Sequence, residues 1–203
     1  AAAYGNPVML PISEVDPCEP VSPYGQSKLM IDQMLESYHR AYGLDYVSFR
    51  YFNACGADPQ GRHGQEPGAT HIIARVLEAS IRKEAFTLNG ADYATPDRTC
   101  IRDYIHVWDL ADAHHRAIKW NTDGRAAIFN LGTNRGISNH EIIDYVNVKY
   151  GPVNVIVGER RPGDPDQLVA NANLANQMLG WSAKFSTLEQ IVDSAYRWYT
   201  REL

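Results

Sequence analysis

The strongest local constraint in this sequence is a helix start at Ser22-Pro23. Serine caps the open N–H groups of a first turn, and proline suits the first helical position. The helix is predicted to run from Pro23 to about Tyr42 and to end at Gly43, the residue type that most often closes a helix. The chain must therefore fold around a long helix near its beginning.

Tyr24 and Lys28 are four positions apart, so this helix presents them on one face, followed there by apolar residues. A positive charge about 4 Å away, at an effective dielectric of about 20, stabilises a phenolate by roughly 4 kcal/mol. A phenolate held in this way can take a proton from an alcohol while a hydride leaves the same carbon, as in nicotinamide-dependent dehydrogenases. The alternative for an isolated pair is a solvated lysine beside a core tyrosine.

The rest of the chain alternates between strands and helices and has no internal repeat. Residues 46–52 are predicted to form a buried strand, residues 127–131 a second strand, and residues 71–82 and 110–120 helices. Two capping boxes predict two further helices, and they lie at Ser138 with Glu141 and at Thr187 with Gln190. The pattern indicates an α/β fold.

Composition narrows the classes of function. The chain has 203 residues, 44% of them hydrophobic, and its net charge of −5 arises from dispersed charges of both signs, which gives no support for nucleic acid or a membrane as partner. No apolar run reaches transmembrane length, and no signal peptide is visible. Cys18, Cys55 and Cys100 are widely spaced and form no CxxC, so we expect neither a disulfide framework nor a metal site. We therefore also expect a reducing, cytoplasmic location.

Six segments occur in an order and spacing that resemble the UDP-glucose 4-epimerases of the extended short-chain dehydrogenase family. They are Ser22 to Met30 with the Tyr24-Lys28 pair, Arg50 to Ala57, Thr95 to Val107, Asn130 to Gly132, Arg160 to Asp164, and Leu179 to Trp181. The resemblance extends over essentially the whole chain. It implies NAD-dependent, reversible inversion at C4 of a UDP-hexose.

The resemblance also implies the architecture. The chain is expected to form the closing part of a doubly wound, parallel, Rossmann-like sheet, together with a smaller α/β substrate-binding domain. Residues 1–52 would belong to the dinucleotide-binding domain, and residues 53–203 mainly to the substrate domain, with the chain crossing back. The family's GxxGxxG turn does not occur in this sequence, which therefore looks like the C-terminal part of an enzyme that is a homodimer at full length.

Several residues receive roles from the resemblance. Tyr24 and Lys28 would be catalytic and would also contact NAD, as would Tyr51. The UDP-hexose would be bound by a larger set, namely Asn53, His71, Arg102, Tyr104, Arg161, Asp164 and Leu168. Arginine suits a diphosphate because its planar guanidinium forms paired hydrogen bonds. The alternative for Arg161 is that the Arg160-Arg161 pair is solvated on the surface. The alternative for His71 is an ordinary histidine in the first turn of a helix.

Two positions depart from the family pattern: Arg98 stands where a turn usually has glycine, and Asn89 stands where many members have an aromatic residue. Leu168 is bulky, which favours plain hexoses over N-acetylated ones. Three readings stay open at this point. They are an epimerase, another nucleotide-sugar enzyme of the same family such as a 4,6-dehydratase or decarboxylase, and a catalytically silent UDP-binding fragment.

Overall fold

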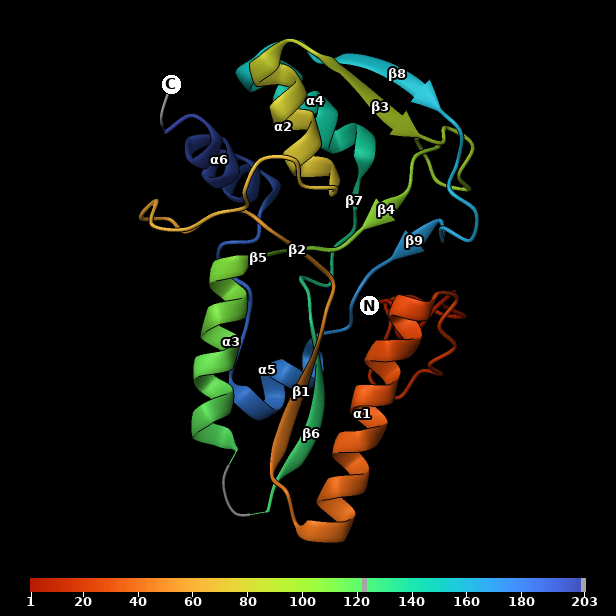
Figure 1. The fold of residues 1–203 in the computed structure, drawn as a ribbon, viewed down its shortest axis with the longest axis vertical. Helices are drawn as coiled ribbons and strands as arrows, with labels where there is room; N and C mark the ends of the chain where they lie inside the picture. The colour runs from red at the N-terminus through yellow and green to blue at the C-terminus, as the bar shows by residue number, and fades with distance from the viewer. Residues whose placement is uncertain (122–123, 202–203) are drawn as a thin grey trace.

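A computed structural model describes residues 1–121 and 124–201, and it shows two halves stacked along the long axis of the molecule (Figure 1). The lower half contains α1 (Pro23–Tyr42), β1 (Tyr46–Tyr51), α3 (Val107–Trp120), β6 (Ala126–Leu131) and α5 (Asn173–Leu179). The upper half contains α2 (Ile72–Arg82), β3 (Ala85–Asn89), α4 (Asn139–Tyr150), β8 (Asn154–Gly158) and α6 (Leu188–Tyr199). Short strands lie between them: β2 (Asn53–Cys55), β4 (Ile101–Arg102), β5 (Tyr104–His106), β7 (Ile137–Ser138) and β9 (Gln167–Leu168).

The strand pairs β1–β6, β2–β5 and β3–β8 are all parallel, and β9 also pairs with β4 in parallel. Only the pairing of β4 with β7 is antiparallel within the described residues. Parallel strands need helical connections, which the chain supplies between each of these partners. The α/β fold with parallel sheets that the sequence predicts is thus confirmed.

The first helix has the predicted bounds because both of its caps form. The Ser22 hydroxyl accepts a hydrogen bond from the Gly25 amide at 3.1 Å, and Gly43 adopts a left-handed φ of 69° and donates to the carbonyl of His39. The apolar face predicted for this helix does not form part of the core, since Ile31 and Tyr38 are exposed. The buried side chain that joins α1 to the sheet is Asp32, an acidic residue.

Asp32 pairs with Arg50 of β1 at 2.9 Å, and the side chains of both are only 9% exposed. Asp32 also accepts a hydrogen bond from Ser48 at 2.5 Å. Because side chains alternate along a strand, this face of β1 is polar. Residues 46–52 were predicted as a buried strand, and the prediction is wrong in this respect: β1 is half-buried, and it ends at Tyr51.

The main core lies in the upper half, between α2, α4, α6 and the β3–β8 pair. Both predicted capping boxes form, at Ser138 with Glu141 on α4 and at Thr187 with Gln190 on α6. The helix predicted for residues 110–120 begins earlier, at Val107, because the His106 ring accepts a hydrogen bond from the Trp108 amide at 3.0 Å.

The two halves meet at Asp103, which separates β4 from β5 and is fully buried. Its carboxylate accepts hydrogen bonds from the Thr133 amide at 2.8 Å and the Ala170 amide at 3.1 Å. Its backbone carbonyl accepts from the amide of Asn53 at 2.9 Å. One buried residue therefore links four segments that are distant in the sequence, three of them through its carboxylate.

Candidate functional site

Six of the predicted site residues line one cavity of about 340 Å³. They come from β2, the start of α2, β4, β5 and the loop that follows β8, and they are Asn53, His71, Arg102, Tyr104, Arg161 and Asp164. The strand register explains part of this arrangement, because β2 and β5 place Asn53 opposite Tyr104.

Arg102 and Asp164 form an ion pair across this cavity, with Nη2 and Oδ1 at 2.6 Å. Arg102 is also held by the backbone carbonyls of Ile101 at 2.7 Å and Pro165 at 2.7 Å. A guanidinium fixed in this way is oriented before any ligand arrives, which lowers the entropic cost of binding. The amide oxygen of Asn89, when turned toward Arg161, lies 3.2 Å from both Nε and Nη2 of that guanidinium.

His71 lies at the N-terminal cap of α2, where unpaired backbone amides and the helix dipole favour an anion. Its Nδ1 atom is buried, and no hydrogen-bond partner for it occurs among the described residues. Burial lowers the pKa of the imidazole, so the ring is held in its neutral form. The cavity thus has an uncharged polar group where α2 begins.

The cavity has further lining residues that the sequence predictions missed, among them Arg75 and Tyr93. Arg75 was within reach of sequence reasoning, since it lies four positions after His71 and so shares its helix face. Its guanidinium carbon lies 5.7 Å from the ring centre of Phe86. Tyr93 follows β3 in a loop with no periodic pattern, and no signal in the sequence identified it.

Four predicted residues lie outside this cavity, and Leu168 and Tyr51 are two of them. Leu168 pairs with Arg102 in the β4–β9 register, but its half-buried side chain packs against a small core cluster that contains Tyr4 and Phe52. The Tyr51 hydroxyl points toward α3 and lies 2.7 Å from Nε2 of His114. The structure does not bring the Tyr51 side chain to the face of β1 that meets α1.

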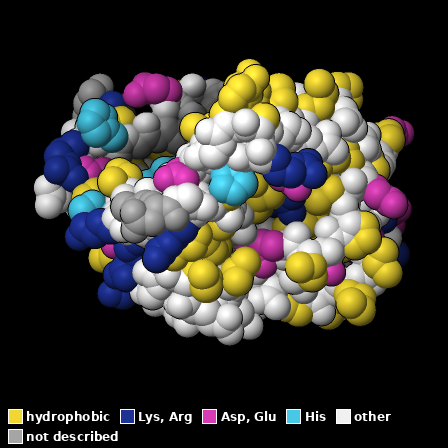
Figure 2. Space-filling model, turned by 90° about the horizontal axis from the view of Figure 1, so that it is seen from below, with side chains coloured by type: hydrophobic (Ala, Val, Ile, Leu, Met, Phe, Trp, Pro, Cys, Tyr) yellow, Lys and Arg dark blue, Asp and Glu magenta, His cyan; other side chains and the backbone are white. Residues whose placement is uncertain are grey.

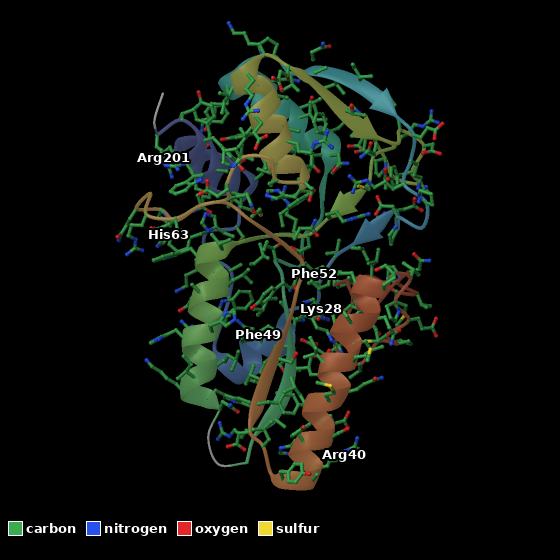
Figure 3. The ribbon with its side chains drawn as sticks, viewed as in Figure 1. Lys28, Arg40, Phe49, Phe52, His63 and Arg201 are labelled. Carbon is green, nitrogen blue, oxygen red and sulfur yellow. The ribbon has the colours of Figure 1, made fainter. Side chains whose placement is uncertain are left out.

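Tyr24 and Lys28 lie on one face of α1, with the ammonium nitrogen 5.1 Å from the ring centre. Tyr24 is 65% exposed, so the phenol is open to a ligand or to another segment. Figure 3 shows Lys28 on the part of α1 that lies toward Phe52, where β1 ends and the segment leading to Asn53 begins. The pair does not line the cavity.

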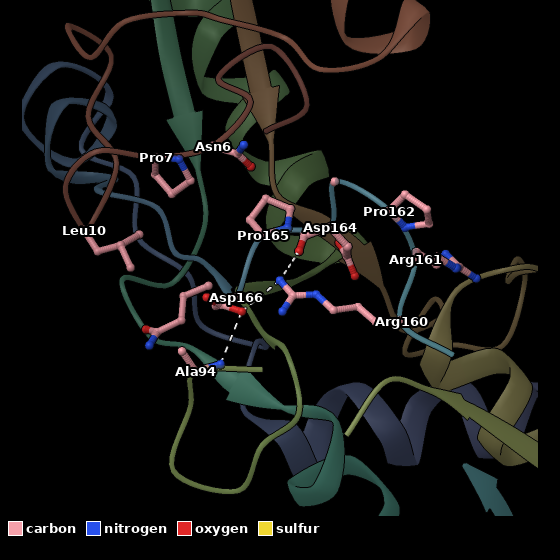
Figure 4. A pocket seen from close by; sticks show the side chains of 12 residues that line it. Asn6, Pro7, Leu10, Ala94, Arg160, Arg161, Pro162, Asp164, Pro165 and Asp166 are labelled. Carbon is pink, nitrogen blue, oxygen red and sulfur yellow. Dashed lines mark hydrogen bonds and ion pairs between the residues drawn. The ribbon is translucent and has the colours of Figure 1, made fainter. Parts of the chain in front are cut away.

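A second cavity, of about 690 Å³, lies on the other side of the loop that follows β8 (Figure 4). Asn6, Pro7 and Leu10 form one wall, and the 160–167 segment forms the other. Arg161 and Asp164 line both cavities, so this loop is the wall between them.

The loop between β3 and β4 accommodates Arg98, which stands where the family pattern usually has glycine. Arg98 adopts a left-handed φ of 65°, the conformation that glycine would take more easily. The turn is supported by Asp97, whose Oδ1 accepts from the Thr99 amide at 2.9 Å. Arginine at this position thus keeps the turn that the family pattern suggests.

Two kinds of feature do not occur among the described residues. No cluster of three or more histidine, cysteine, aspartate or glutamate side chains is arranged to hold a metal there. In the same part of the chain, no helix has the length and hydropathy needed to cross a membrane.

Comparisons with known proteins agree with the resemblance. The chain is 44% identical over 203 residues to the UDP-glucose 4-epimerase of Halalkalibacterium halodurans, covering 98% of this chain and 61% of that protein. It is 47% identical over 202 residues to the corresponding protein of Azospirillum brasilense, covering 58% of it. The chain thus spans about three fifths of the length of these relatives.

Solved structures give the same result for the fold. The UDP-glucose 4-epimerase of Bifidobacterium longum, in complex with NAD⁺ and UDP, matches with a TM-score of 0.92 and 35% identity over 100% of this chain and 62% of that one. A second, from Stenotrophomonas maltophila, with bound NAD and formylated UDP-arabinopyranose, matches with a TM-score of 0.92 and 31% identity over 98% of this chain and 60% of that one. The sequence model of the NAD dependent epimerase/dehydratase family matches residues 1–132, more than half of the chain. On these grounds the chain belongs to the NAD dependent epimerase/dehydratase family.

Proposed function

We propose that this chain is the nucleotide-sugar-binding and proton-transferring part of a UDP-glucose 4-epimerase. The observation that carries the proposal is the convergence of Asn53, His71, Arg102, Tyr104, Arg161 and Asp164 on one cavity. These residues are spread over more than half of the chain, and unrelated surface residues would not meet in this way. Relatives that are 44% and 47% identical to this chain are named as enzymes of this activity.

The cavity suits a nucleoside diphosphate. Arg161 supplies a planar donor group for the diphosphate, and the α2 N-terminus beside His71 supplies backbone amides. Asp164 offers carboxylate oxygens to hydroxyl donors such as those of ribose. The uridine diphosphate would be held firmly, while the hexose reaches out of the cavity toward α1.

Tyr24 and Lys28 would act on the hexose. The phenolate oxygen of Tyr24 takes the proton from the 4-hydroxyl and later returns it to the same oxygen. The Lys28 ammonium lies 5.1 Å from the ring centre of Tyr24, and its positive charge would stabilise the phenolate. Because Tyr24 is exposed, its hydroxyl is free to reach a bound sugar.

The residues present suit part of an NAD site. The exposed Tyr24-Lys28 face offers a hydroxyl and an ammonium, which are groups that hydrogen-bond a ribose. When bound, NAD supplies acceptance and return of the hydride at C4 of the sugar. This sequence lacks a GxxGxxG turn, so we expect these residues to hold one end of the cofactor only. We also propose that the longer enzyme is a homodimer, which the exposed apolar face of α1 supports.

Calorimetric titration of the 203-residue chain with UDP tests the binding part of this proposal. We expect saturable binding of UDP, weaker binding of uridine because it lacks the diphosphate, and unchanged UDP affinity in Tyr24→Phe. Absence of UDP binding by a folded chain would refute the proposal. Turnover of UDP-galactose with added NAD tests the second part, and we expect none from protein whose mass matches this chain alone.

A further inference from the structure

Tyr93 is a buried tyrosine at the edge of the nucleotide cavity, and it lies in the loop between β3 and β4. Its side chain is only 3% exposed and lines the cavity with Arg161 and Asp164. A glycine makes room for it, since a Cβ atom on Gly90 would come within 2.6 Å of the Tyr93 ring. The ring therefore occupies a space that the loop backbone leaves open for it.

The hydroxyl of Tyr93 holds one oxygen of Asp164. It donates a hydrogen bond to Oδ2 at 2.9 Å, while Oδ1 of the same carboxylate accepts from Arg102 at 2.6 Å. Burial and the hydrogen bond with Asp164 raise the pKa of the Tyr93 phenol, so it remains a donor at neutral pH. Asp164 is thus fixed from two sides, by Tyr93 of the β3–β4 loop and by Arg102 of β4.

The ring of Tyr93 supports Arg160, whose guanidinium carbon lies 4.0 Å from the ring centre. Arg160 in turn donates to the backbone carbonyl of Asp164 at 2.6 Å and pairs with Asp166 at 2.9 Å, so that it folds back over its own loop (Figure 4). The next residue, Arg161, lies on the cavity side. The two adjacent arginines therefore have different roles: Arg160 stabilises its own loop, and Arg161 lines the cavity proposed for the ligand.

We propose that Tyr93 is a positioning residue that fixes the 160–166 loop, and through it Asp164 and Arg161, in the geometry that receives a nucleoside diphosphate. The inference rests on the proposed function for the identity of the ligand. It adds a residue that touches no reacting atom and acts through its two contacts, the hydroxyl on Asp164 and the ring under Arg160.

The test compares Tyr93→Phe with Tyr150→Phe in the 203-residue chain. Tyr150 is a matched control because its hydroxyl also donates to a carboxylate, that of Asp193 at 2.6 Å, in the upper half of the molecule and outside this cavity. Two quantities are measured: the dissociation constant for UDP, and the hydrogen–deuterium exchange of the amides in residues 160–166 without ligand. The thermal midpoint of each variant records any general loss of stability.

For Tyr93→Phe we expect a dissociation constant about tenfold higher and faster exchange in the 160–166 loop, since a hydrogen bond to a charged group is lost. For Tyr150→Phe the dissociation constant for UDP and the amide exchange should equal those of the unchanged chain. This should hold even if its thermal midpoint falls as far as that of Tyr93→Phe. Unchanged exchange in Tyr93→Phe overturns the inference whether or not UDP binds. Faster exchange with unchanged UDP affinity also overturns it, whereas a failure of the unchanged chain to bind UDP overturns only the proposed function.

Discussion

At the scale of single residues, Arg161 is the cavity arginine that the loop leaves facing a ligand. We expect Arg161→Ala to weaken UDP binding by about 1.5–3 kcal/mol, because a charge-assisted contact with the diphosphate would be lost. The measurement is a calorimetric titration. Arg125→Ala is a suitable control, since Arg125 lies beside Trp120 at the far end of α3. Equal affinities for the Arg161 variant and the unchanged chain would remove Arg161 from the site.

Asp103 gives a pH dependence of stability. Burial raises the pKa of this carboxyl from 3.8 to about 6, so the folded state favours the protonated form. The contribution of Asp103 to the free energy of unfolding is therefore complete below about pH 4 and is lost as the pH rises to about 6, by on the order of 3 kcal/mol. Above that pH it stays constant.

Urea denaturation of the unchanged chain and of Asp103→Asn between pH 4 and 7.5 measures this effect. The free energy of unfolding of the unchanged chain, relative to that of Asp103→Asn, should fall as the pH rises to about 6 and then stay constant. A difference that is independent of pH would show that Asp103 titrates in the same range in the folded and unfolded chain.

At the scale of elements, the Asp32–Arg50 ion pair attaches α1 to β1. Removing one partner leaves a buried charge unpaired, so Asp32→Ala should lower the free energy of unfolding by about 3–5 kcal/mol. The matched control is the exposed pair Glu36–Arg40 on the same helix, with side chains 57% and 69% exposed. Glu36→Ala should cost no more than about 0.5 kcal/mol. Similar losses for the two variants in chemical denaturation would contradict this assignment.

The outer face of α1 provides a prediction about association. Exposed apolar side chains run along it, namely Met30, Ile31, Met34, Tyr38 and Tyr42. From below, hydrophobic side chains also cover much of the surface on the right, where α1 lies (Figure 2). We expect the chain to self-associate in sedimentation equilibrium and Met34→Glu to weaken this. Val148→Glu also replaces an exposed apolar residue, on α4, and it should leave the self-association unchanged.

Elements were predictable from the sequence where the signal is local. Ser22 and Gly43 set the bounds of α1, and Ser138 and Thr187 mark the starts of α4 and α6 through hydrogen bonds within one turn. The side of α1 that is buried was not predictable. It depends on Arg50, a partner from the next element, with which Asp32 forms a buried ion pair.

At the scale of the whole molecule, motif resemblance pointed to six of the residues that line one cavity, and pattern reasoning did not. Arg102 and Asp164 meet because β9 lies beside β4, a pairing between short strands that no periodicity reveals. Tyr93 reaches Asp164 because β3 pairs with β8, so that the loops after both strands are neighbours. Contacts of this kind depend on long-range strand order, and a sequence shows that order only through relatives.

The Asp32–Arg50 pair has a further consequence for the geometry of the two functional regions. Arg50 is ion-paired to α1, and Asn53, three residues later, lines the cavity proposed for the nucleotide. Extended chain rises about 3.3 Å per residue, so roughly 10 Å of backbone separates the two points. The backbone from Arg50, near the end of β1, to Asn53 in β2 therefore sets a fixed separation between α1 and the cavity in which we propose that the nucleotide binds. The backbone would then set the distance at which a sugar attached to that nucleotide meets the Tyr24 phenol. No side-chain movement would be needed to establish this distance.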